Sequence, residues 1–154
     1  MEENIFHLQN ISKSFGEKIL FKNVSLQIHG SEKVGLIGAN GSGKTTLFSL
    51  ISKDEEPDDG NIILKKNITL GYLPQMVGMI EGQTILEMVM NTDTDKKIEK
   101  HHAEKTLSGL GFSQSDLQRD LSEFSGGRQM RVLLAKVLAR DNDLMLLDEP
   151  TNHL

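Results

Sequence analysis

Eight consecutive residues constrain the fold of this chain more than any other stretch: Gly38-Ala39-Asn40-Gly41-Ser42-Gly43-Lys44-Thr45. They match G-x-x-x-x-G-K-[ST], the pattern of a phosphate-binding P-loop. Residues 33–37 before the motif are short and apolar, as in a buried parallel strand, and residues 46–51 after it have apolar side chains at helical spacing. The motif thus has a strand–loop–helix context, which predicts an α/β fold with a phosphate-binding loop.

The residue types in this loop suit a nucleoside triphosphate. Gly41 and Gly43 allow backbone dihedrals and a close approach that a side chain would block. Successive N–H groups can then point at a phosphate, helped by the positive end of the following helix. Lys44 would reach the β- and γ-phosphates, and the Thr45 hydroxyl would bind Mg²⁺. The positions expected to bind ATP phosphates are Gly38, Asn40, Gly41, Ser42, Gly43, Lys44, Thr45 and Thr46.

The composition excludes several classes of protein. The 154 residues suffice for one domain with a sizeable core. The chain has no cysteine, so neither a disulfide partner nor a thiolate metal site is expected. No signal peptide and no apolar run of membrane-spanning length is evident. We therefore expect a cytoplasmic protein that does not associate with a membrane. A net charge of −5 with 5% aromatic residues argues against a general nucleic-acid surface.

The N-terminal residues alternate between apolar and polar in two runs, 5–11 and 19–28, with Gly16 and Glu17 between them. This pattern predicts an antiparallel hairpin. Phe15 lies at its tip, where an aromatic ring can either stack on adenine or simply pack at the turn. The spacing alone leaves both interpretations open.

Two further strands are expected at residues 61–64 and 68–73, the second ending at Pro74. Gln75 follows directly. A glutamine at a strand end near phosphates can ligate Mg²⁺ or position a water molecule, and otherwise it is an ordinary polar loop residue.

Residues 84–124 have a different character. Thr84 and Glu87 have the spacing of a capping box ahead of an apolar run. Later apolar residues share one helical face, and Gly111 suits a helix stop. The sequence therefore predicts a small helical insert between α/β parts.

A second anion site is expected at Ser125-Gly126-Gly127, because Ser125 is placed as an N-cap and two glycines open a helix. Two glycines in a first turn cost helix stability, which favours a functional interpretation over an ordinary capped helix. The inward side of this helix is expected to comprise Met130, Leu133, Leu134, Val137 and Leu138.

The apolar run 144–147 leads into Asp148 and Glu149, which predicts a buried strand with carboxylates at its carboxyl end. Ligands bind at such ends in open α/β sheets. Asp148 suits a Mg²⁺ ligand, and Glu149 suits a general base for an attacking water.

In this order, the motifs resemble an ABC-type ATPase domain, and the resemblance covers essentially the whole chain. It implies a mixed sheet with an N-terminal antiparallel β part and a helical insert. It also implies adenine stacking by Phe15 and a Q-loop role for Gln75. Ser125 to Gln129 match the signature motif, which contacts the γ-phosphate bound to the opposite domain of a dimer. Asp148 and Glu149 match the Walker B carboxylates.

The final residues 148–154, Asp-Glu-Pro-Thr-Asn-His-Leu, are similar to the D-E-P-T-N-H-L-D of ABC-F proteins. That resemblance implies an ATPase with two ABC domains in one chain that acts on the ribosome in translation control or antibiotic protection. The chain would be an incomplete first domain: a β part and P-loop core at 1–83, the insert at 84–124, and the signature helix and Walker B strand at 125–154.

Three features qualify the resemblance. Arg128 stands where the family usually has Gln, Glu or Trp, and its effect on the trans phosphate contact is open. The insert between Gln75 and Ser125 is too short for a long arm hairpin. The chain ends before the family's D-loop aspartate and switch histidine, so by itself we expect it to be a poor ATPase. The alternatives are the ATP-binding subunit of an ABC membrane transporter and a non-catalytic remnant or engineered fragment.

Overall fold

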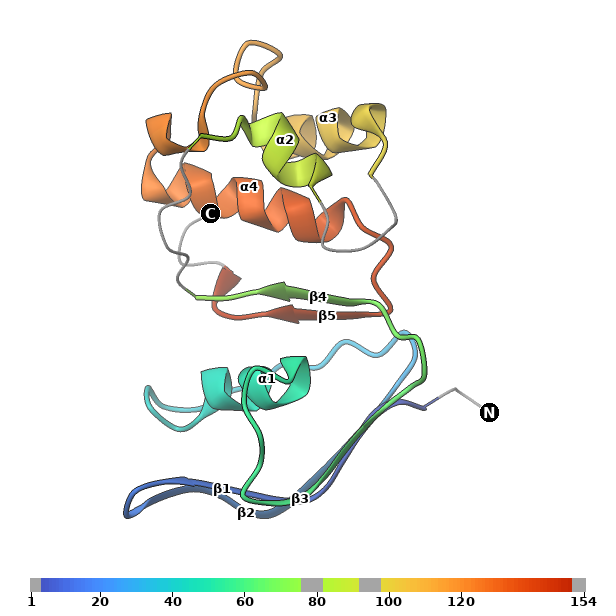
Figure 1. Cartoon of the computed structure of the whole chain (residues 1–154), viewed down its shortest axis with the longest axis vertical. Helices are drawn as coiled ribbons and strands as arrows, with labels where there is room; N and C mark the ends of the chain where they lie inside the picture. Colours follow the sequence, from blue (N-terminus) through green and yellow to red (C-terminus); the bar gives the residue numbers. More distant parts are fainter. Residues whose placement is uncertain (1–3, 76–81, 92–97, 151–154) are drawn as a thin grey trace. The chain divides into compact units, whose positions relative to one another are not determined.

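Residues 4–75, 82–91 and 98–150 are described by a computed structural model of the chain (Figure 1). The chain divides into two compact units between Leu70 and Gly71. The ABC-F-like ending at residues 151–154 lies outside the described residues.

The first unit contains a three-stranded antiparallel sheet. Its strands are β1 (Asn4–Phe15), β2 (Lys18–His29) and β3 (Asp59–Leu64), in the order β2-β1-β3. Phe15 pairs with Lys18 across a turn of two residues, so the predicted hairpin is confirmed. The predicted strand at 61–64 is confirmed as β3.

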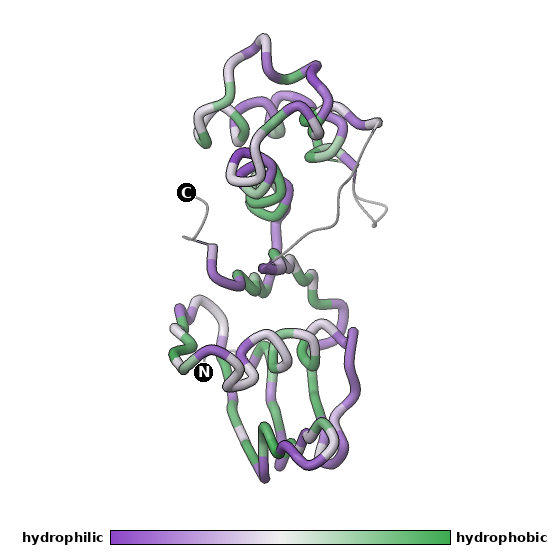
Figure 2. Tube along the Cα trace, turned by 90° about the vertical axis from the view of Figure 1, so that its left-hand side faces the viewer, coloured by the Kyte–Doolittle hydropathy of each residue, from purple (hydrophilic) through white to green (hydrophobic). Residues whose placement is uncertain are grey.

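The core of this unit follows from the alternation along its central strand. Phe6, Leu8 and Ile11 of β1 are fully buried. Figure 2 shows apolar residues recurring along the strands, with polar residues in the connections. Helix α1 (Lys44–Ser52) lies over one face of the sheet (Figure 1) and buries Leu47 and Leu50. Burial of each such side chain contributes roughly 1.5–3 kcal/mol.

One predicted strand of this unit is wrong. Residues 33–40 form no strand or helix, and the side chains of Val34, Leu36 and Ile37 are exposed, that of Ile37 by 96%. An apolar run becomes a strand only where neighbouring strands bond to its backbone. The sheet of this unit, within residues 4–70, comprises only β2, β1 and β3.

Gly60 gives a sharp test of the pairing between β1 and β3. Its φ is +90°, and an added Cβ would lie 2.5 Å from the carbonyl oxygens of Gln9 and Asn10, where the register shifts. Gly60→Ala should therefore lower the free energy of unfolding by roughly 2–5 kcal/mol, from strain and overpacking together. Urea unfolding followed by circular dichroism measures the loss.

Gly16 is the matched control for this substitution. It also has a positive φ, +58°, but an added Cβ would meet nothing within 4 Å. Gly16→Ala should cost only the backbone strain, roughly 1–2 kcal/mol. Equal losses for the two variants would contradict the close approach at Gly60.

The described part of the second unit combines two parallel strands with three α-helices. Strand β4 (Leu70–Leu73) pairs with β5 (Leu144–Leu147), and both run in the same direction in Figure 1. The helices are α2 (Ile85–Met90), α3 (Lys100–Gly109) and α4 (Gly126–Leu138), with a 3₁₀ turn η1 (Leu121–Glu123). The strand at the end of the chain is therefore confirmed, although Met145 within it is exposed.

A contiguous apolar core joins the three helices. Its side chains come from α2, from α3, from the segment between α3 and α4, and from α4 itself. Its fully buried members are Ile85, Val89, Ala103, Leu107, Val132 and Ala135. The helical character predicted for residues 84–124 is confirmed, with apolar spacing as its cause.

The helix ends agree with the sequence in part. The Thr84 side chain accepts from the Glu87 backbone N–H while the Glu87 carboxylate accepts from that of Thr84, so the capping box is confirmed. Ser125 occupies the N-cap of α4 without a side-chain cap bond. Leu138 was predicted to lie on the inward side of α4. This prediction is wrong, because Leu138, the last residue of the helix, is exposed.

Candidate functional site

The predicted P-loop combines two glycines of positive φ with the start of a helix. Helix α1 begins at Lys44 with Gly43 as its N-cap, and φ is +75° at Gly41 and +102° at Gly43. The Ser42 N–H donates to the Ala39 carbonyl at 3.1 Å. Residues 38–42 ahead of the N-cap are exposed, and the first N–H groups of a helix have no partner within the helix, so the start of α1 suits an anion.

Lys44 extends back across this loop. Its ammonium donates to the carbonyls of Gly38 at 2.9 Å and Ala39 at 3.2 Å. The cation is thus held at the loop by neutral acceptors. Phosphate oxygens would replace them with charge-assisted bonds, which are roughly twice as strong.

The tip of the hairpin is tied to the same loop. Phe15 is 50% exposed, and the Lys13 ammonium lies 5.2 Å from its ring centroid. Lys18 donates to the Gly41 carbonyl at 3.0 Å. Sequence reasoning missed Lys18, although a two-residue turn after Phe15 already places Lys18 opposite it. The exposed ring leaves the stacking interpretation of Phe15 available.

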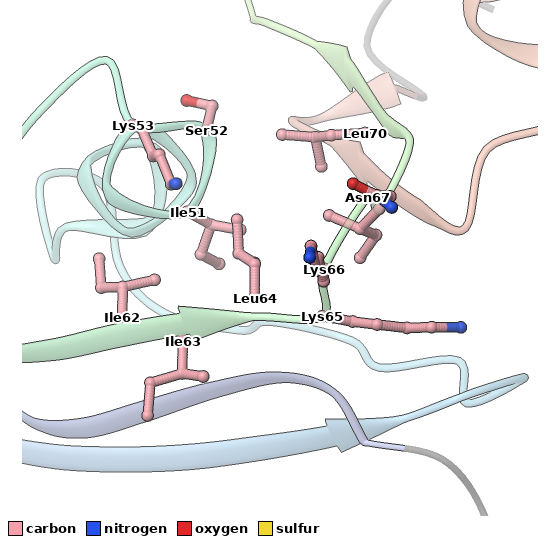
Figure 3. A pocket seen from close by; sticks show the side chains of 11 residues that line it. Ile51, Ser52, Lys53, Ile62, Ile63, Leu64, Lys65, Lys66, Asn67 and Leu70 are labelled. Carbon is pink, nitrogen blue, oxygen red and sulfur yellow. The ribbon is translucent and has the colours of Figure 1, made fainter.

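A separate cavity of about 580 Å³ lies at the other end of α1 (Figure 3). Its lining includes Ile51 and Lys53 from the end of the helix and Ile62 and Leu64 from β3. The phosphate loop is at the start of the helix, and nine residues of helix span roughly 13 Å. The cavity is therefore not part of the predicted nucleotide site.

In the second unit, two predicted catalytic residues are in contact. The Gln75 side-chain amide donates to a Glu149 carboxylate oxygen at 3.0 Å. The two residues follow the ends of β4 and β5, and parallel strands bring their carboxyl ends to one edge. Their proximity is therefore a consequence of the β4–β5 pairing.

Asp148 and Glu149 differ in environment. Asp148 is only 4% exposed, and its backbone N–H donates to the Leu73 carbonyl at 3.0 Å. Glu149 has a φ of +48°, a left-handed conformation that a non-glycine residue adopts at a cost of about 1–3 kcal/mol. Such strain concentrates at functional sites, which supports the choice of Glu149 as a reactive group.

Ser125, Gly126 and Gly127 open α4, and the first two are exposed. The Gln129 side chain donates to the Phe124 carbonyl at 2.8 Å and its backbone N–H donates to the Ser125 carbonyl at 2.9 Å. These bonds hold the first turn in place. The N–H groups at the start of the helix have no acceptor within the helix. The predicted anion site thus lies at the start of α4.

The metal prediction rests on Thr45, Gln75 and Asp148. Thr45 belongs to the first unit, and the other two belong to the second. Over residues 4–75, 82–91 and 98–150, no group of three or more His, Cys, Asp or Glu side chains is arranged to hold a metal. Mg²⁺ is usually bound by one or two protein groups together with phosphate oxygens and water, so a protein cage is not required.

A family model described as ABC transporter matches residues 21–152. The chain belongs to the ABC transporter family. Among the described residues of this ABC transporter family member, no helix is long and apolar enough to cross a membrane.

Relatives of this family member include ABC-F proteins. ABC transporter F family member 2 of Arabidopsis thaliana is 37% identical over 96% of the chain. The energy-dependent translational throttle protein EttA of Haemophilus influenzae is 35% identical, and the ribosome protection protein VmlR of Bacillus subtilis is 34% identical, each over 99% of the chain. The chain spans 28%, 28% and 27% of the length of these three proteins, respectively.

Solved structures have the same fold. A bacterial ABC transporter cassette, whose structure is a dimer, gives a TM-score of 0.81 at 27% identity over 97% of this chain and 76% of its own. An ABC transporter ATP-binding protein from Pyrococcus furiosus gives 0.82 at 24% identity, over 94% and 75%. The predicted ABC ATPase fold, with its antiparallel and parallel sheets, is confirmed.

Proposed function

We propose that this chain binds Mg-ATP as one ABC domain of an ABC-F-type ATPase that acts on the ribosome in translation control or antibiotic protection. The observation that carries the catalytic part is the 3.0 Å hydrogen bond between Gln75 and Glu149. It places an amide and a carboxylate, one able to ligate Mg²⁺ and one able to accept a proton, at the same strand ends.

Each residue then has a defined role. Phe15 stacks on adenine, the residues from Gly38 to Thr46 cradle the phosphates, and Thr45, Gln75 and Asp148 hold Mg²⁺. Glu149 takes a proton from the attacking water as its oxygen bonds to the γ-phosphorus. The bond between that phosphorus and the bridging oxygen breaks, so ADP and phosphate leave.

A second ABC domain, in the same chain or in a second copy, completes the site. The γ-phosphate of the ATP bound to that domain contacts Ser125, Gly126 and Gly127. The organisation would be a β part and P-loop core at 1–83, the insert at 84–124 and the signature helix with the Walker B strand at 125–154. The dimeric solved cassette supports the pairing of two domains. The proposed place of action is the cytoplasm.

The ribosomal part is supported by the names of two relatives, a translational throttle and a ribosome protection protein. A second candidate is the ATP-binding subunit of a membrane transporter. It is favoured by the transporter structures with the same fold, among them an inward-facing metal-chelate type transporter at 24% identity and a TM-score of 0.77.

Sedimentation separates the two candidates. In a lysate containing the natural full-length protein, ATP should bring the protein into the ribosomal fractions of a sucrose gradient. The Lys44→Ala variant should remain in the top fractions, because the ATP-bound state is required for the interaction. Recovery in washed membranes with an integral membrane protein would instead support the transporter subunit.

A further inference from the structure

Arg128 is the third residue of α4, directly after the two glycines of the signature segment. Its side chain is only 32% exposed. The guanidinium carbon lies 4.9 Å from the ring centroid of Phe112 and 4.7 Å from that of Phe124. The side chain therefore lies against the aromatic rings of its own unit instead of extending into solvent.

Asp116 holds the same guanidinium. An Arg128 Nη2 lies 3.2 Å from an Asp116 carboxylate oxygen, and the Asp116 side chain is 12% exposed. The Ser113 backbone N–H and hydroxyl donate to that carboxylate and, with Arg128, lower the pKa of Asp116 to about 2. Asp116 is thus ionised at neutral pH, and it opposes any movement of Arg128 toward another anion.

The position of Arg128 would otherwise be unfavourable. A cation in the first turn of a helix opposes the positive end of the helix dipole, and the first turn of α4 contains no acidic residue. Asp116 and the two ring faces supply the compensating interactions from outside the helix. The contacts join the start of α4 to the segment that follows α3.

Phe124 transmits this arrangement to the signature segment. It directly precedes Ser125. The guanidinium carbons of Arg128 and Arg119 lie 4.7 Å and 4.6 Å from the centroid of its ring. Arg119 also pairs with Asp116 at 3.2 Å. The residue that leads into the N-cap thus contacts both guanidinium groups.

We propose that Arg128 is a positioning residue: with Asp116 and Phe124 it forms a clamp that sets the orientation of Ser125, Gly126 and Gly127, and it does not bind phosphate itself. This inference rests on the proposed function, because it presumes that the segment meets a γ-phosphate of another domain. On this inference, an arginine replaces the family's usual residue at position 128 because its contacts are with residues of the helical insert.

The competing role, direct contact between Arg128 and a phosphate, makes the opposite prediction for Asp116. If Arg128 bound phosphate, Asp116 would compete for it, and Asp116→Asn would leave turnover unchanged or raise it. In the clamp, Asp116→Asn removes the ion pair that orients Arg128, and turnover falls. The sign of this one effect separates the two roles.

The test uses the natural full-length protein, with steady-state ATP hydrolysis and calorimetric ATP affinity measured for each variant. Arg128→Gln and Asp116→Asn should each lower kcat roughly 10- to 100-fold, as expected for misplaced catalytic groups. ATP affinity should stay within about twofold, because the P-loop lies in the other unit. The double variant should be no worse than the poorer single variant, since the two residues act together.

Arg128→Lys and Lys100→Gln complete the design. Lysine keeps the charge but not the planar group that stacks on Phe124, so Arg128→Lys should not restore turnover. Lys100→Gln removes an exposed cation of the same unit, whose partner Glu104 is 3.8 Å away, and should leave kcat unchanged.

Unchanged or increased turnover in Asp116→Asn, or full activity in Arg128→Lys, would overturn the clamp. So would a parallel loss of ATP affinity, which would show a general folding role. Failure of the proposed ATPase activity is distinguishable, because the unsubstituted protein would then not hydrolyse ATP. Failure of the ribosomal part alone would leave ATP hydrolysis, and with it this test, intact.

Discussion

Lys44→Ala should weaken binding of Mg-ATP by roughly 10- to 100-fold. The ammonium lies at the phosphate loop, where it donates to the carbonyls of Gly38 and Ala39. A charge-assisted hydrogen bond contributes about 1.5–3 kcal/mol, and each 1.4 kcal/mol corresponds to about tenfold in affinity. The loop N–H groups and the start of α1 remain in the variant, so residual binding is expected.

Calorimetric titration with Mg-ATP measures this loss. Lys22→Ala is the matched control, because Lys22 is an exposed lysine of β2 in the same unit and its removal changes the net charge equally. Equal affinity for Lys44→Ala and the unsubstituted protein would show that residues 38–46 are not the nucleotide site.

The second large effect concerns turnover. Glu149→Gln should lower kcat by roughly 10²–10⁴-fold, because an amide cannot take a proton from the attacking water. The substitution preserves shape, and its side-chain oxygen can still accept the hydrogen bond that Gln75 donates at 3.0 Å to the carboxylate. Binding of ATP should therefore be retained, and the full-length variant should accumulate on ribosomes in its ATP-bound state.

Single-turnover release of phosphate from the full-length protein gives this rate without interference from product release. Glu104→Gln serves as the control, since Glu104 is on α3 and pairs only weakly with Lys100 at 3.8 Å. Hydrolysis by Glu149→Gln at the unsubstituted rate would mean that another group is the base.

The local features of the fold could be predicted because they depend on neighbours in the sequence. The hairpin around Gly16 follows from alternation and a short turn, and the capping box at Thr84 follows from residues three positions apart. Residues 33–37 were mispredicted because a strand also needs partners from elsewhere in the chain. Apolar composition alone does not supply them.

The remaining features could not be predicted because they depend on contacts between residues that are far apart in the sequence. Gln75 and Glu149 are 74 positions apart, and only the pairing of β4 with β5 brings their side chains together. The role of Arg128 was open for the same reason. The Arg128 side chain is oriented by its ion pair with Asp116, and no local sequence pattern predicts that pair.

The two-residue turn between Phe15 and Lys18 restricts how this hairpin can vary. Surface turns generally accept insertions. Here one added residue would shift the register of β2 by one position and exchange the two faces of the strand. It would also move the Lys18 ammonium away from Gly41, to which it donates at 3.0 Å. Substitutions at Gly16 or Glu17 should therefore be tolerated in evolution or engineering far more readily than changes in turn length.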